Sequence, residues 1–80
     1  MERVISGIEK TADVSGGDAC VAGTRIPVWI LEQARRHGAS EGDLLADYPS
    51  LTAADLATSW EYVSANRAEV ETVIQENEDA

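Results

Sequence analysis

The sequence predicts a mostly α-helical domain: a helix-turn-helix-like core of three helices, a short N-terminal β element and a C-terminal helix. Three observations predict this fold class. Helix start and stop signals recur after residue 26, apolar residues repeat at helical spacing, and a glycine-flanked apolar segment precedes the first helix. The 80 residues suffice for one small domain, which we place at residues 1–75, followed by an acidic, frayed tail at 76–80.

The β element is predicted from the segment between the glycines at residues 16–17 and Gly23. Val21 and Ala22 lie between these glycines and indicate a short strand held between two turns. Nearer the N-terminus, the apolar residues Val4, Ile5 and Ile8 fit either another short strand or one helical turn.

The first core helix is predicted from Pro27 to His37. Proline has a preset φ and lacks an N–H group that would be unpaired in the first turn, so Pro27 suits a helix start. Gly38 ends the helix directly after three basic residues at 35–37, which the negative end of the helix dipole favours.

Two capping boxes predict the starts of the next two helices. Ser40 has Asp43 three residues later, and Thr52 has Asp55 at the same spacing. Between them, Pro49 pushes the preceding residue out of the helical region and so ends the second helix. Two helices joined by a tight turn, after an earlier helix, give the outline of a helix-turn-helix domain.

The third helix carries an apolar stripe that continues beyond it. Asn66 followed by Glu69 is a further cap signature, so we expect a break or kink at Asn66 rather than one long helix to about Glu76. We expect Trp60 in the core. The stripe, at helical spacing, is Leu56, Trp60 and Val63, and the spacing continues through Arg67, Val70 and Ile74. The opposite face of the third helix is then Ala54, Asp55, Thr58, Glu61 and Tyr62.

The charge balance is strongly acidic. Fifteen acidic residues and six basic residues give a formal net charge of −9 at pH 7. Such a chain repels nucleic acid at long range unless its few cations gather on one face. Two origins of this composition stay open: a high-salt intracellular environment, or a GC-rich genome combined with an acidic tail. A gain in thermal stability at molar KCl would indicate the first.

The chain offers no pattern for a catalytic, metal or cofactor site. Cys20 and His37 are its single cysteine and histidine, so neither an internal disulfide nor zinc-ligand spacing is available. A phosphate loop ending at Gly23 would need a glycine where Asp18 stands. We expect Cys20 to be a small buried side chain, and we predict a protein that is not an enzyme. With no signal-peptide pattern and no membrane-spanning apolar run, we expect a cytoplasmic location.

Two sequence segments resemble those of a known protein family. The segment Cys-Val-Ala-Gly-Thr-Arg-Ile-Pro-Val at residues 20–28, together with Asp-Tyr-Pro-Ser-Leu at residues 47–51, is similar to the domain of unknown function family 433, which is described as VapB-type antitoxin-like. The resemblance covers about residues 8–74. It implies a helical, often dimeric domain that is associated with toxin–antitoxin pairs, the toxin being a PIN-like ribonuclease. The chain departs from the family pattern at Asp18-Ala19, where a basic residue followed by proline is usual.

The resemblance and the charge together predict an antitoxin-like module that binds and neutralises such a nuclease, working as a homodimer. We expect Arg25, Ile26 and Trp29 to contact the partner or the second copy. The alternative is a homodimeric DNA-binding regulator, which the acidic charge disfavours. Its expected nucleic-acid contacts are Arg35, Arg36 and Thr58.

Overall fold

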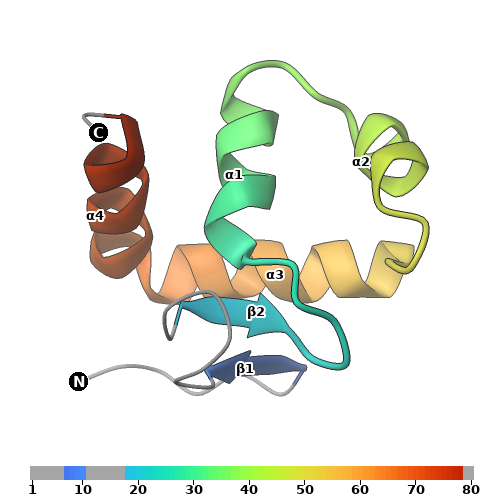
Figure 1. The fold of residues 1–80 in the computed structure, drawn as a ribbon, viewed down its shortest axis with the longest axis horizontal. Coiled ribbons are helices and arrows are strands. Elements are labelled where there is room, and N and C mark those ends of the chain that lie inside the picture. Colours follow the sequence, from blue (N-terminus) through green and yellow to red (C-terminus); the bar gives the residue numbers. More distant parts are fainter. Residues whose placement is uncertain (1–6, 11–17, 79–80) are drawn as a thin grey trace.

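A computed structural model describes residues 7–10 and 18–78. Val4, Ile5, the glycine pair at 16–17 and residues 79–80 of the tail lie outside the described residues. The elements are β1 (Ile8–Lys10), β2 (Ala19–Val21), α1 (Val28–Arg36), α2 (Glu41–Asp47), α3 (Ala53–Ala65) and α4 (Arg67–Glu78). In Figure 1, α3 runs along the base of the helical layer, α1 crosses it, and the two strands lie against its other side. The mostly α-helical fold class is confirmed.

β1 and β2 form an antiparallel pair in which Ile8 faces Val21 and Lys10 faces Ala19. β2 therefore begins and ends earlier than the predicted strand, and Ala22 belongs to the turn that follows. All three residues of β2 are buried, because α1 and α3 cover the pair.

The helix starts follow the predicted capping signals. In both boxes the hydroxyl accepts from the backbone N–H three residues later, and the aspartate accepts from the cap's own N–H. The distances are 2.9 and 3.0 Å for Ser40 with Asp43, and 2.9 and 3.1 Å for Thr52 with Asp55. Pro27 is the residue before α1 rather than its first helical residue, and α1 ends one residue before His37.

The break at Asn66 is confirmed. The Asn66 N–H donates to the Tyr62 carbonyl at 2.9 Å, its side-chain Nδ2 donates to the same oxygen at 3.2 Å, and its carbonyl accepts from Val70 N–H at 3.1 Å. The backbone and side-chain groups of this single residue, Asn66, thus end α3 and cap the start of α4. α4 then continues through Glu78, two residues beyond the predicted end of the helical pattern.

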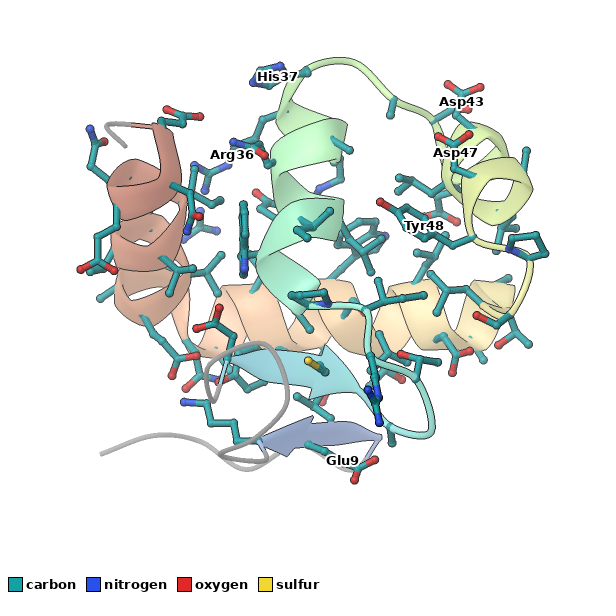
Figure 2. All side chains as sticks on the ribbon, viewed as in Figure 1. Glu9, Arg36, His37, Asp43, Asp47 and Tyr48 are labelled. Carbon is teal, nitrogen blue, oxygen red and sulfur yellow. The ribbon has the colours of Figure 1, made fainter. Side chains whose placement is uncertain are left out.

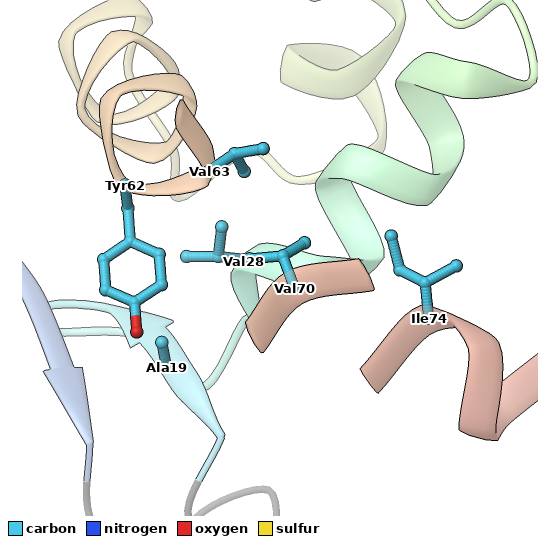
Figure 3. Packing of buried hydrophobic residues seen from close by; sticks show 6 residues of the cluster. All are labelled: Ala19, Val28, Tyr62, Val63, Val70 and Ile74. Carbon is cyan, nitrogen blue, oxygen red and sulfur yellow. The ribbon is translucent and has the colours of Figure 1, made fainter. Parts of the chain in front are cut away.

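The core consists of two clusters, both of which use residues of α1 and α3. The first lies between β2, α1, α3 and α4 (Figure 3), and the second reaches α2. The first cluster contains Ala19, Val28, Tyr62, Val63, Val70 and Ile74. The second contains Val21, Leu31, Leu44, Leu51 and Leu56.

Two positions on α3 differ from expectation. Tyr62, expected on the exposed face, is only 2% exposed, because the strand pair packs on that side of α3 and the Tyr62 ring points toward Ala19 (Figure 3). Trp60, expected in the core, is half-buried. Its ring lies under the Arg35 guanidinium, 4.3 Å from the ring centroid, and its Nε1 donates to Glu41 at 3.1 Å. An indole with a polar edge is stable at such a boundary.

Candidate interaction surface

The turn between β2 and α1 presents Arg25. Thr24 fixes this turn, because its Oγ1 donates to the Val21 carbonyl at 2.8 Å and accepts from Ile26 N–H at 3.1 Å. Gly23 adopts φ +79°, which favours glycine, and its N–H donates to Glu9 at 2.9 Å. Arg25 is exposed and makes no ion pair with the described residues. Thr24 and Gly23 therefore fix the turn, and the Arg25 side chain is available to a partner protein.

The other two predicted partner contacts pack against the chain's own core. Ile26 is half-buried against the second cluster, and Trp29 is half-buried against the first. The structure does not gather the three residues into one exposed patch: Arg25 and Ile26 lie on the turn, whereas Trp29 lies in the first turn of α1 at the α4 side.

Arg35 and Arg36, the predicted nucleic-acid cations, are occupied by acids. Arg35 Nη2 lies 2.6 Å from Glu32 Oε1, and Arg36 Nε lies 2.8 Å from Glu32 Oε2. Arg36 also extends from α1 toward α4 (Figure 2), where its Nη2 reaches Glu71 at 2.5 Å. Arg36, and to a smaller extent Arg67, hold the pKa of Glu71 below its usual range.

Glu32 is a residue that sequence reasoning missed. Its side chain is 4% exposed, although it carries a charge, because the two arginines hydrogen-bond both carboxylate oxygens. The spacing of Glu32 to Arg35 and Arg36, three and four residues on, was the available signal for ion pairing. That the Glu32 carboxylate would also be buried could not be read from this local spacing.

Thr58, the third predicted nucleic-acid contact, lies against the strand pair. Its Oγ1 donates to the Ala54 carbonyl at 3.0 Å, and a Cβ at Gly7 would approach its Cγ2 to 3.1 Å. The part of α3 around Thr58 is therefore adjacent to backbone of the same chain rather than open.

A second polar cluster joins β1, α3 and α4. The Tyr62 hydroxyl donates to Glu69 at 2.5 Å, and Lys10 Nζ lies 2.7 Å from the other oxygen of Glu69. Burial, reinforced by the Glu69 carboxylate, raises the pKa of Tyr62 well above its usual range. Sequence reasoning missed this cluster, because it placed Tyr62 on the exposed face of α3.

We expect alkaline pH to destabilise the fold through Tyr62. An unfolded tyrosine ionises near pH 10, whereas the folded one resists ionisation, so stability is full below about pH 10 and is lost as pH rises above it. Tyr62→Phe should reduce the loss in urea midpoint between pH 9 and 11, and Tyr48→Phe, at a half-buried position, serves as the control. An unchanged loss in Tyr62→Phe would contradict the assignment.

The described residues show neither a metal site nor a membrane-spanning helix. No group of three or more His, Cys, Asp or Glu among them is placed to hold a metal ion. Within the same residues, no helix combines the length and apolar character that crossing a bilayer requires. Cys20 is a free, buried thiol, 3% exposed, as predicted.

The chain belongs to the family of proteins of unknown function DUF433, whose pattern matches residues 8–63. The chain also resembles the crystal structure of a DUF433 member protein from Anabaena variabilis ATCC 29413, at 43% sequence identity and a TM-score of 0.84. The similarity covers 86% of this chain and 68% of that one. No curated protein matches. These findings confirm the family that the two sequence strings predicted.

Proposed function

We propose that this chain is a non-catalytic, antitoxin-like module of the cytoplasm that binds and neutralises a PIN-like ribonuclease through protein–protein contacts, acting as a homodimer. The observation that carries the proposal is the distribution of charge. Lys10, Arg35 and Arg36 are paired with acids, and Arg67 lies near Glu71. Arg25 and Arg67 are the exposed arginines that make no ion pair with the described residues, and Arg25 is the one of the two that lies on the turn between β2 and α1.

This arrangement is complementary to a nuclease that binds RNA. An RNA-binding groove is basic, so an acidic chain with a net charge of −9 is attracted to it, and the encounter is accelerated. The metal-holding carboxylates of such a nuclease are in turn a suitable target for one arginine on a fixed turn. A rigid turn also lowers the entropy lost on binding.

The alternative is a DNA-binding regulator, which α2 and α3 favour by their helix-turn-helix-like arrangement. A recognition helix usually offers cations and amides to the base edges, with further cations for phosphates. α3 contains no Lys, Arg, Asn or Gln. Its exposed residues are Ala53, Ala54, Ala57, Glu61 and Ser64. Binding would therefore need Arg35 and Arg36 of both copies of a dimer, released from their acids.

The proposal is tested by co-expressing this chain with the adjacent small reading frame and purifying through a tag on this chain alone. We expect a nuclease-like partner to co-purify in fixed proportion. A bare homodimer that then binds duplex DNA with a steep salt dependence would instead support the regulator.

Arg25→Glu should weaken the complex by at least about thirtyfold, because a central arginine that meets carboxylates is typical of an interface hot spot. Arg67→Glu makes the same charge change on exposed α4 and serves as the matched control. Affinity is measured by titration calorimetry, and thermal melts show that both variants fold. Equal losses of affinity for the two variants would show that net charge alone sets the affinity and that Arg25 makes no specific contact with the partner.

A further inference from the structure

A small cavity lies where β2, α1, α3 and α4 meet. Its volume is about 10 Å³, which is close to the space of one water molecule. Its lining combines Trp29 and valines of α1 and α4 with the polar residues Asp18, Tyr62 and Glu69. Asp18, Trp29 and Glu69 are half-exposed, so the cavity can be reached from the surface.

The chain's own lysine shows which group the rim accepts. The Lys10 ammonium lies 2.7 Å from Glu69, the same carboxylate that accepts from the Tyr62 hydroxyl. Lys10 therefore offsets the charge of Glu69. Asp18 is different, because its carboxylate makes no ion pair or hydrogen bond with the described residues. Among the residues that the structure describes, the charge of Asp18 therefore has no counter-ion.

We propose that this cavity is a binding site for one primary ammonium group, the end of a lysine side chain. Three features of the site fit that ligand: Asp18 supplies the opposite charge, the lining includes Trp29, a residue type that attracts cations, and the volume admits one heavy atom with its hydrogens. A guanidinium has four heavy atoms in a plane and is too large. A divalent metal would need about six oxygen ligands, which the lining does not supply.

The source of the lysine rests on the proposed function, since the basic groove of an RNA-binding nuclease carries such side chains. Binding of the ammonium group itself does not depend on that function. The two claims can therefore fail separately.

The test uses methylammonium chloride as the probe and the ¹⁵N-labelled chain as it stands. The chain has two tryptophans, so two indole N–H signals are seen: Trp29 lines the cavity, and Trp60 lies at the α2 side and serves as an internal reference. Trp60→Phe assigns the signals. We expect the Trp29 signal to shift along a saturating curve while the Trp60 signal shifts no more than with NaCl at equal ionic strength.

Variants that should weaken or strengthen methylammonium binding make the test more specific. Asp18→Asn should weaken methylammonium binding at least about threefold, because the uncompensated charge is lost, and Lys10→Gln should strengthen it at least about twofold, because a competing cation is removed. Asp47→Asn, on α2 and outside the cavity, should leave the affinity unchanged. Tetramethylammonium should bind more weakly than methylammonium, because it exceeds the cavity.

Equal, non-saturating shifts of both indole signals would overturn the proposal, as would an equal effect of Asp18→Asn and Asp47→Asn. Saturable binding without any co-purifying nuclease would support the ammonium site and count against the proposed function. A nuclease that co-purifies with a chain that does not bind methylammonium would support the proposed function and overturn the ammonium site.

Discussion

Leu56→Ala is expected to lower the free energy of unfolding by about 3.5 kcal/mol, the middle of the range for buried leucine truncations. Leu56 is 0% exposed at the centre of the second cluster, where α1, α2 and β2 meet α3. Because these elements surround it, the cavity left by truncation has little freedom to collapse. A domain of this size has a total stability on the order of 4–12 kcal/mol, so this one change removes a large part of it.

Urea unfolding followed by circular dichroism measures this effect. Leu45→Ala is the matched control, since Leu45 is half-buried at the edge of the same cluster and should lose about 1 kcal/mol. The two variants have the same chemical change and differ in burial. Similar losses for both would show that the second cluster is not the centre of the fold.

Glu32→Ala is expected to lower the free energy of unfolding by about 2 kcal/mol. The change leaves two arginines side by side and removes the acid that holds both. Removing one partner of a fully buried ion pair typically costs about 3–5 kcal/mol. The side chains of Arg35 and Arg36 remain 45% and 32% exposed, so they can hydrate, and the loss should be smaller.

Glu76→Ala, an exposed acid on α4, is the control for this charge change and should alter stability by less than about 0.5 kcal/mol. Most of the difference between the two variants should persist at 1 M KCl, because the Glu32 carboxylate is 4% exposed and is screened less than a surface acid. A Glu32→Ala effect that matches the control would show that Glu32 is not held as the structure has it.

The sequence predicted most of the elements, because their signals are local. Both capping boxes involve residues three positions apart, and the break at Asn66 was predicted from a further cap signature, Asn66 with Glu69, although the apolar stripe continues past it. Such signals act before any tertiary contact forms. They locate helix starts well and say little about which faces become buried.

The missed features depend on contacts between distant segments. Tyr62 is buried among residues of β2, α1 and α4, and Arg36, one of the two arginines that hold Glu32, also bridges from α1 to Glu71 on α4. For the same reason, only part of the candidate site could be predicted from the sequence. The turn that carries Arg25 was identified from its glycine and proline, whereas the cavity beside Trp29 arises only when α4 folds back.

The arrangement of charge also explains why a helix-turn-helix-like outline need not indicate DNA binding. Four of the five basic residues in the described part of the chain lie beside acids, and the exposed face of α3 carries Glu61 without a cation. A surface of this kind repels phosphate and attracts a basic protein. On the proposed function, the fold would serve as a scaffold for the Arg25 turn and an acidic surface.

The most direct test of the central claim is inhibition of the partner nuclease by this chain. The isolated nuclease is mixed with a fluorescent RNA substrate, and the chain is titrated in. Our account predicts that cleavage stops at a fixed whole-number ratio of chain to nuclease and returns when the two are separated. Cleavage that continues unchanged in the presence of excess folded chain would contradict it.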